Sequence, residues 1–475
     1  MDATTNHPQP YTLGIDLGTT SIKIVIVDSA GGVVENVTVP SLANVTSIVG
    51  EDGAEQCPVA IWNALHAGLK QIDPDNQVKV QTIGISGQMH GLLLWKQGKS
   101  WERGNDQMRH IILRNLSHLY TWQDRRCSKE FLATLPKPDS RLRVASGYGC
   151  VTYLWLLHNQ REMLATEQYD CVGTVMDFVV AAICDLAHPV TSDQLAASFG
   201  YFNVESRTWN TDILKSCGFP VNVLPEVRKA GQVAGHLLQG LEHIPAGTPV
   251  LCAMGDMQCG VLSGAQDRSD ATLNISTSIQ LSVRVDDILS GRLMGEAVEV
   301  VPYFDNFHLA VVAGLNGGNV LTSLASLVKH WLQELGLIPQ DILETALLEK
   351  LSSLGQKSPS DSTLKICPTV FGERHDPDLL ASAEGISAHN ASLGAMFRAA
   401  SEGIVDNIFR LLPPEVLASN GLKRVVGSGS VLRNPLVLKR TQEILAGKLE
   451  FVQGTESDAA LGAAKASLAF LQQQQ

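Results

Sequence analysis

The sequence predicts an α/β fold built from two related domains. Short apolar strands alternate with helical patterns along most of the chain, which is typical of a largely parallel sheet covered by helices. A strand–turn–strand opening with a Thr/Ser turn occurs twice, near the N-terminus and again after residue 270, and this suggests a duplicated fold. The length of 475 residues allows two or three domains, each large enough to bury its own core.

The first half opens with three strands joined by tight turns between Tyr11 and Val39. A helical pattern at 60–72 follows, and two apolar strands are expected at 78–86 and 92–95. Irregular backbone is expected at 98–110, at 135–141 and around 355–363, where glycine, proline and polar residues gather.

The second half repeats the opening with strands on either side of the Thr277–Ser278 turn, and the domain boundary is therefore placed at 265. The predicted domains are 10–264 and 265–472. The remaining elements expected here are strands at 298–303, 308–313 and 424–427, and helices at 320–335, 341–354, 393–412, 435–446 and 459–471.

Charge and cysteine content restrict the class of protein. The chain carries 48 acidic and 36 basic side chains, a net charge of −12, without a long Lys/Arg run, which argues against nucleic acid as a partner. The nine cysteines are scattered and show no zinc-type spacing, so they are expected to be free thiols. The N-terminus lacks a signal-peptide layout, and no apolar run approaches the ~20 residues that span a bilayer, so a cytoplasmic location and no membrane partner are expected.

The first candidate site is the end of the first strand, with Asp16, together with the turn that follows it, with Gly18, Thr19 and Thr20. Glycine lets backbone N–H groups approach phosphate oxygens, the hydroxyl groups add donors, and a carboxylate at a strand end can hold a Mg²⁺-bound water. An ordinary hairpin turn explains the same residues. The second Thr/Ser turn favours the phosphate interpretation, because two such hairpins could clamp phosphates from both sides.

Two further glycine-containing turns each precede a helix. The segment Gly427-Ser-Gly429-Ser430 follows a strand and could bring a phosphate or a flat ring close to a helix N-terminus. It matches neither a P-loop nor a convincing dinucleotide-binding fingerprint. Gly317 and Gly318 could play a supporting part, although a helix N-cap explains them equally well.

Three polar segments could bind or activate a substrate. Asp256 follows an apolar strand, where a carboxylate can accept a proton from a hydroxyl group, although many such residues only cap helices. Gln88 and His90 lie on a loop between strands and suit hydrogen bonding to a polyol, although a lone histidine is more commonly structural. The Thr121–Arg126 segment could line a sugar pocket or could be a solvated helix start.

In this order, these segments resemble the FGGY carbohydrate kinases, and the resemblance extends from about Thr12 to Ala464. The motifs that carry it are Asp16-x-Gly-Thr-Thr-x-x-Lys23, Gln88-Met-His-Gly91, Trp122-Gln-Asp-Arg125, Ser192-Asp-Gln-Leu-Ala-Ala-Ser198, Gly255-Asp256, Ser276-Thr-Ser278, Gly372-Glu-Arg374, Gly427-Ser-Gly429 and Ala460-Leu-Gly-Ala-Ala464. The resemblance implies the two-domain fold of actin, hexokinase and Hsp70, with a ribonuclease H-like core and an active-site cleft between the domains. It also implies ATP and Mg²⁺ as cofactors.

The resemblance further implies roles for individual residues. Asp256 would be the catalytic base, and Asp16 would be the carboxylate near Mg²⁺. Sugar contacts would come from Gln88, Met89, His90, Asp124 and Asp256, mainly in the first domain. ATP contacts, mainly in the second domain, would come from Gly18, Thr19, Thr20, Lys23, Thr277, Gly317, Gly318, Gly427, Gly429, Ser430 and Asn434. Ser276 replaces the first glycine common in the second phosphate turn, so the backbone there is expected to approach phosphate less closely.

Within the family, the sequences of the motifs are most similar to those of the kinases that act on sedoheptulose. This implies phosphorylation of the terminal hydroxyl of sedoheptulose to sedoheptulose 7-phosphate, which feeds the pentose phosphate pathway. A pentulose kinase acting on xylulose or ribulose is the alternative within the family, and a noncatalytic ATP-binding sugar sensor is the alternative outside it. Met89 and His90 argue against glycerol, because glycerol kinases carry an Arg-Glu pair there. The sequence leaves open whether the chain is a monomer or a homodimer.

Overall fold

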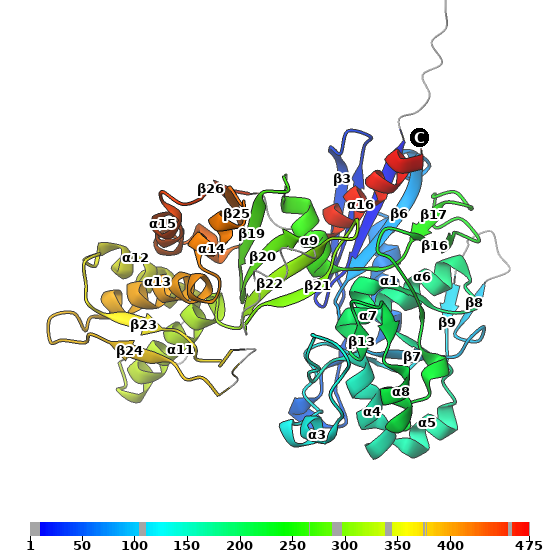
Figure 1. Cartoon of the computed structure of the whole chain (residues 1–475), viewed down its shortest axis with the longest axis horizontal. Coiled ribbons are helices and arrows are strands. Elements are labelled where there is room, and N and C mark those ends of the chain that lie inside the picture. Colours follow the sequence, from blue (N-terminus) through cyan, green and yellow to red (C-terminus); the bar gives the residue numbers. More distant parts are fainter. Residues whose placement is uncertain are drawn as a thin grey trace, which may run out of the picture. The chain divides into compact units, whose positions relative to one another are not determined.

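The computed structural model describes residues 10–103, 111–265, 267–286, 297–337, 344–373, 376, 378–454 and 458–474. The chain divides into two compact units, drawn with their elements in Figure 1. The first unit comprises Met1–Ser263, Val301–Asn306 and Asp458–Gln475, and the second comprises Gly264–Val300 and Phe307–Ser457. The last helix therefore belongs with the N-terminal part of the chain, whereas a single division at 265 would place it in the second domain.

The first unit is built around a mixed sheet, which in the described part of the chain has seven strands in the order β16-β17-β6-β1-β2-β3, with β18 also paired to β6. The strands are β1 (Tyr11–Leu17), β2 (Ser21–Val27), β3 (Val33–Pro40), β6 (Val80–Gly87), β16 (Val233–His236), β17 (Pro249–Leu251) and β18 (Met254–Gly255). β1, β2 and β3 pair antiparallel, while β1, β17 and β18 run parallel to β6.

Some of the remaining elements of this unit pack against the sheet, and others form small sheets or a separate apolar cluster. The helices are α1 (Pro58–Leu69), α2 (Pro74–Gln77), α3 (Lys129–Thr134), α4 (Gly149–Asn159), α5 (Arg161–Glu167), α6 (Val175–Cys184), α7 (Asp193–Phe199), α8 (Thr211–Ser216), α9 (Asp256–Gly264) and α16 (Ala459–Gln474). The short strands are β4 (Asn44–Val45), β5 (Glu55–Gln56), β7 (Leu93–Trp95), β8 (Trp101–Arg103), β9 (Ile111–Leu113), β10 (Leu119–Tyr120), β11 (Cys171–Gly173), β12 (Val190–Ser192), β13 (Phe202–Asn203), β14 (Thr208–Trp209) and β15 (Glu226–Arg228).

The second unit repeats the same strand pattern. The order β22-β20-β19-β25-β26 matches β3-β2-β1-β6-β17, and the four pairings have the same sequence of antiparallel, antiparallel, parallel and parallel. The strands of its sheet are β19 (Asp270–Ile275), β20 (Ile279–Val285), β21 (Glu299–Pro302), β22 (His308–Gly314), β25 (Arg424–Ser428) and β26 (Glu450–Gln453), and the last two residues of β21 are grouped with the first unit. The predicted duplication is thus visible in the topology, although the sheets are mixed rather than largely parallel, because tight turns join the opening strands of each.

The helices of the second unit pack around this sheet and enclose a separate apolar core. They are α11 (Gly318–Glu334), α12 (Glu344–Lys357), α13 (Leu393–Leu411), α14 (Pro414–Ser419) and α15 (Pro435–Leu445), and β23 (Lys365–Cys367) pairs with β24 (Ser382–Glu384). The predicted helices agree with these elements to within a few residues, except that 341–343 lies outside the described residues. None of the described helices is long and apolar enough to cross a membrane.

Helix α16 lies directly against the backbone of the first sheet (Figure 1, red helix beside the blue strands). A Cβ atom at Gly14 would collide with the Ala460 carbonyl oxygen and with the backbone of Ala464, and a Cβ atom at Gly84 would collide with the Ala463 carbonyl oxygen. The Thr12 hydroxyl donates a hydrogen bond to the Ala464 carbonyl oxygen at 3.0 Å. These contacts explain why the last helix belongs to the first unit.

The nine cysteines are all free, as predicted. Six of them are buried, and burial is the main cause that raises the pKa of their thiols, to about 12 for Cys127, Cys171, Cys184 and Cys252. A thiol with such a pKa stays protonated at neutral pH and is a poor nucleophile.

The Gly14→Ala variant tests the importance of the close contact with α16. We expect the added methyl group to lower the free energy of unfolding by about 3 kcal/mol, because backbone atoms of α16 would have to move. Urea denaturation of the two proteins measures this difference. Gly264→Ala is the control, since its Cβ would meet nothing within 4 Å, and an equal loss of stability in both variants would contradict the packing argument.

Candidate active site

Two aspartates predicted to take part in catalysis lie at the same edge of the first sheet. Asp16 is next to the last residue of β1, and Asp256 directly follows β18 as the first residue of α9. Both strands run parallel to β6, where Ser86 pairs with Asp16 and Gly87 pairs with Gly255. Their carboxyl ends therefore meet at one edge, which is where open α/β sheets bind ligands.

The carboxyl group of Asp16 is buried, and its environment favours the protonated form. Burial is the largest cause that raises its pKa to about 7, and the charge of Asp256 raises the pKa further. Lys23 is the register partner of Asp16 on β2, and its charge lowers the pKa of Asp16. Atom Oδ1 of Asp16 is buried and has no hydrogen-bond partner among the described residues, so this oxygen is available to a cation or a proton.

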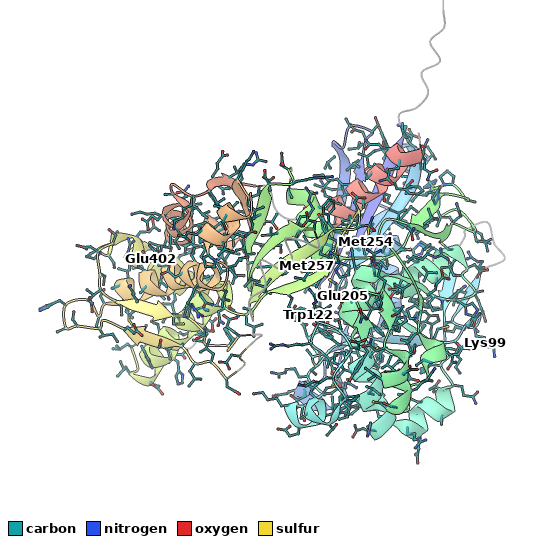
Figure 2. All side chains as sticks on the ribbon, viewed as in Figure 1. Lys99, Trp122, Glu205, Met254, Met257 and Glu402 are labelled. Carbon is teal, nitrogen blue, oxygen red and sulfur yellow. The ribbon has the colours of Figure 1, made fainter. Side chains whose placement is uncertain are left out.

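Asp256 is placed to act as a base. Burial of its carboxyl group raises its pKa to about 6, while the backbone N–H of Met257 donates a 2.8 Å hydrogen bond to Oδ1 and lowers the pKa. Met254 and Met257, which flank Gly255 and Asp256 in the sequence, are labelled in Figure 2. A carboxyl group with this pKa is mostly ionised at neutral pH, close to the optimum for accepting a proton in catalysis.

The donor set suits a metal that keeps most of its coordination outside the protein. In the described segments, no group of three or more His, Cys, Asp or Glu side chains could hold a metal ion. Mg²⁺ is commonly held by one or two carboxylates, with waters and substrate phosphates completing its shell. The unpartnered Oδ1 of Asp16 fits that requirement.

The predicted sugar loop packs against the residue that precedes Asp256. A Cβ atom at Gly255 would collide with the thioether of Met89, so the loop and the start of α9 are in contact. The side chain of Gln194 accepts a 3.2 Å hydrogen bond from the Gly255 N–H. Gln194 therefore helps to position Asp256, a role that the sequence motif Ser192-Asp-Gln194 alone did not reveal.

His90 is held firmly in the same loop. Its Nδ1 lies 2.8 Å from the Ser198 carbonyl oxygen, and because a carbonyl oxygen can only accept, Nδ1 carries the proton of this bond. Its ring stacks on Tyr148, with centroids 4.4 Å apart and planes 14° from parallel. The backbone of His90 has φ of 74°, a left-handed conformation that a non-glycine residue adopts at a cost. Tyr148 was not identified from the sequence.

The structure does not support direct sugar binding by Asp124. Its Oδ1 accepts hydrogen bonds from the backbone N–H and the Nε of Arg126, and its Oδ2 accepts from Arg126 and from the Ala54 N–H, at 2.7–3.1 Å. A carboxylate has about four such acceptor positions, and here all are used. The side chain is also fully buried. Asp124 is thus a structural partner of Arg126, which in turn donates to Glu55 at 2.7 Å. The alternative of a solvated helix start is wrong, since α3 begins only at Lys129.

The first predicted phosphate turn uses Thr19 for internal bonds. The Thr19 hydroxyl donates to Gln88 Oε1 at 3.4 Å and accepts from the indole N–H of Trp122 at 3.0 Å. Thr20 is exposed, and the Gly18 N–H donates to the Ser21 carbonyl oxygen at 3.1 Å. Gln88 joins this turn to the short strand that contains Gln56 through its hydrogen bonds. Because it is only 3% exposed, it offers little of its surface to a ligand.

The second unit brings together three of the turns predicted to bind ATP. The Gly318 N–H donates to the Ser276 carbonyl oxygen at 2.7 Å, and the Asn319 N–H donates to the Thr277 carbonyl oxygen at 3.1 Å. A Cβ atom at Gly317 would overlap the backbone of Ser278. Gly429 has φ of 102°, and a Cβ atom there would collide with the Ile275 carbonyl oxygen. The glycines therefore permit the close approach of these turns.

The other predicted ATP residues lie around the same strand ends. Gly427 pairs with Leu273 between β25 and β19, and Ser430 is exposed just after β25. Asn434 caps α15, since its Oδ1 accepts the Leu436 N–H at 3.0 Å. Its side-chain oxygen is thus engaged in a helix cap.

The buried side chain of Glu373 binds the residues just before the Gly317–Gly318 turn, and the sequence alone gave no role for it. Glu373 is fully buried and accepts hydrogen bonds from the side chains of Asn316 at 3.0 Å and Asn407 at 2.7 Å, and from the Leu315 N–H at 3.2 Å. Asn316 immediately precedes Gly317. The partners of Glu373 come from segments far apart in the sequence, so no local pattern could have indicated this hydrogen-bond network.

Comparison with known proteins shows the family to which the chain belongs. The model of the FGGY family of carbohydrate kinases, N-terminal domain, matches residues 11–263. The mouse sedoheptulokinase (Mus musculus) is 42% identical over 469 residues, covering 96% of this chain and 97% of the mouse protein. The human sedoheptulokinase (Homo sapiens) is 41% identical over 470 residues, with the same coverage. The chain belongs to the FGGY family of carbohydrate kinases and is a sugar kinase.

Solved structures of the family confirm the predicted fold. A xylulose kinase from Rhodospirillum rubrum superposes with a TM-score of 0.76 at 17% identity, over 97% of this chain and 89% of that chain. At this low identity the likeness concerns the fold alone. The α/β fold with two related units is thus shared along nearly the whole chain.

Asp124→Asn tests the structural role of Asp124. Because Arg126 is buried, we expect the loss of its partner's charge to lower the free energy of unfolding by about 3 kcal/mol. The control is Glu205→Gln, which breaks an exposed pair with Arg141 (Glu205 is labelled in Figure 2) and should cost less than about 1 kcal/mol. Urea denaturation measures both. If Asp124→Asn kept full stability and only raised the sugar KM, Asp124 would be a sugar ligand instead.

Proposed function

We propose that this chain transfers the γ-phosphoryl group of MgATP to the terminal hydroxyl of sedoheptulose, giving sedoheptulose 7-phosphate and ADP. The observation that carries the proposal is the identity of 41–42% with two sedoheptulokinases over 96% of the chain. This similarity extends over both units. The expected place of the reaction is the pentose phosphate pathway.

In this proposal, Asp256 is the catalytic base. It accepts the proton of the attacking sugar hydroxyl, and its pKa of about 6 keeps it ionised at neutral pH. The sugar is held by the first unit, where Met89 contacts Gly255 and His90 is fixed by Ser198 and Tyr148. A base held at the end of a strand and against a rigid loop suits a reaction that depends chiefly on alignment.

Asp16 would hold the magnesium ion, directly or through a bound water. When bound, Mg²⁺ would neutralise charge on the transferred phosphoryl group. Asp16 contributes its buried Oδ1, and Lys23 on the paired strand adds positive charge nearby.

The nucleotide would bind mainly to the second unit. An acidic chain with a net charge of −12 must bind anionic ATP through turn N–H groups, hydroxyls and the metal rather than through a basic surface. The joined turns at Thr277, Gly317–Gly318 and Gly427–Ser430 provide glycines and hydroxyls at the ends of β19 and β25. Asn434 would contribute to nucleotide binding by capping the start of α15 beside the Gly427–Ser430 turn.

Asp256→Asn tests the assignment of the base. We expect kcat for sugar phosphorylation to fall by about 10²- to 10⁴-fold while the Kd for ATP stays unchanged. Coupled-assay kinetics and calorimetry measure the two quantities. Asp212→Asn is the control, because it makes the same change at an exposed position near the start of α8. Substantial turnover by Asp256→Asn would show that another group takes the proton.

A panel of sugars tests the substrate. With MgATP and purified protein, we expect kcat/KM to be highest for sedoheptulose among sedoheptulose, xylulose, ribulose and glycerol. A clear preference for a pentulose would replace the heptulose assignment with the alternative in the same family. No sugar-dependent release of ADP with any of the four would favour the noncatalytic sugar sensor.

A further inference from the structure

Hydrogen bonds between three residues of the first unit close into a ring. The Thr19 hydroxyl donates to Gln88 Oε1 at 3.4 Å, Gln88 Nε2 donates to Gln56 Oε1 at 2.9 Å, and Gln56 Nε2 donates to the Thr19 carbonyl oxygen at 2.7 Å. The ring begins and ends on Thr19. It therefore joins the turn predicted to bind phosphate with the first residue of the loop predicted to bind sugar.

The directions of these bonds follow from one fixed acceptor. A backbone carbonyl can only accept, so the Thr19 carbonyl requires the amide nitrogen of Gln56 to face it. The oxygen of Gln56 must then face Gln88, which orients the Gln88 amide and makes its oxygen the acceptor for the Thr19 hydroxyl. The donors all run in one direction around the ring, an arrangement in which neighbouring hydrogen bonds strengthen each other.

Gln56 is the member of the ring that lies outside both candidate loops. It belongs to β5, a two-residue strand paired with β4 and β10, and it is 1% exposed. Its second amide hydrogen goes to Asn44 Oδ1 at 2.8 Å. Gln56 thus uses both N–H groups and its oxygen within the protein, and because its side chain is also buried we expect it to contact neither sugar nor phosphate.

No other side chain reproduces this set of bonds. Glutamate would place an acceptor against the Thr19 carbonyl and Asn44 Oδ1, which are themselves acceptors in this arrangement. Methionine has a similar length but offers no hydrogen bond, and it would leave the buried groups around it without partners.

We infer that Gln56 is a positioning residue that holds the phosphate turn and the sugar loop in fixed register for phosphoryl transfer. The inference rests on the proposed function. Because the reaction depends on alignment, a displacement of about 1 Å between the two loops could cost about 10²-fold in rate. The loss should fall mainly on kcat, since Gln56 contacts neither ligand.

The chain provides a matched control in Gln77. Gln77 is also 1% exposed and also makes three hydrogen bonds, donating to the Leu69 and Ile72 carbonyl oxygens at 2.9 Å and accepting from the His243 N–H at 3.1 Å. It lies in the same unit, and none of its hydrogen bonds reaches Thr19 or Gln88. Replacing it disturbs a buried glutamine without disturbing the ring.

The test compares Gln56→Glu and Gln56→Met with Gln77→Met. We expect kcat for sugar phosphorylation to fall about 30- to 100-fold in both Gln56 variants, with the sugar KM changed less than about threefold. Gln77→Met should keep kcat within about twofold even where its denaturation midpoint falls. Hydrogen–deuterium exchange provides a readout without turnover: peptides covering 17–21 and 87–91 should both exchange faster in the Gln56 variants and stay unchanged in Gln77→Met.

Each outcome of these measurements either supports or overturns the positioning role of Gln56. Equal kcat in the Gln56 and Gln77 variants, with equal losses of stability, would reduce Gln56 to a structural residue and overturn the inference. Faster exchange in only one of the two peptides would also overturn it. If the wild-type protein phosphorylated none of the four sugars, the proposed function would fail. Joint faster exchange of both peptides would then still support the coupling of the two loops, and unchanged exchange would overturn it.

Discussion

The contact between α16 and the first sheet is the constraint on which the active-site geometry depends. Residues of a strand alternate between its two faces, so Thr12, Gly14 and Asp16 all face α16. The absence of side chains at Gly14 and Gly84 allows the helix to lie against the backbone of the strands. Asp458, just before the helix, then lies near enough to Asp16 to raise its pKa, and the Ser86 hydroxyl is within 3.2 Å of carbonyl oxygens on both β1 and α16. The environment of one catalytic candidate is thus fixed by the last helix of the chain.

The duplicated topology carries different chemistry in its two copies. In the first unit, the strand ends carry carboxylates, Asp16 and Asp256, whose burial raises their pKa values. The corresponding strand ends of the second unit carry the glycines and hydroxyls of the Thr277, Gly317–Gly318 and Gly429 turns. The first set suits a cation and a proton, and the second suits an anion approached by backbone N–H groups. One strand order therefore presents groups of different electrostatic character at the strand ends of the two units.

The sequence was sufficient where a signal is local and failed where it is not. The strands between Tyr11 and Pro40 and the helix at 393–411 were predicted nearly to the residue, because their apolar patterns and tight turns are strong. Asp16 and Asp256 could be selected because each lies at the end of an apolar strand. The roles of Asp124 and Glu373 could not be predicted. Arg126, two residues from Asp124, gives three of its hydrogen bonds, but the fourth comes from the distant Ala54, and the partners of the Glu373 carboxylate all lie in distant segments. The six helices between 129 and 216 were also missed, and several of these contribute to a separate apolar cluster that no single segment indicates.

The short strand β5 connects the structural and the functional networks. Its two residues point to opposite sides, so Glu55 can bind Arg126, His118 and Ser47 while Gln56 binds Thr19, Asn44 and Gln88. Through Arg126, Glu55 stabilises the same turn that presents Trp122 to the Thr19 hydroxyl (Trp122 is labelled in Figure 2). The hydrogen bonds from both faces of β5 therefore lead to Thr19.

Because these bonds occupy the Thr19 carbonyl and hydroxyl, contacts from this turn to a phosphate are left to backbone N–H groups and to the exposed Thr20. These bonds hold Thr19 in place, and in the proposed function this positioning, rather than a large number of free hydroxyl groups, is what the turn would contribute.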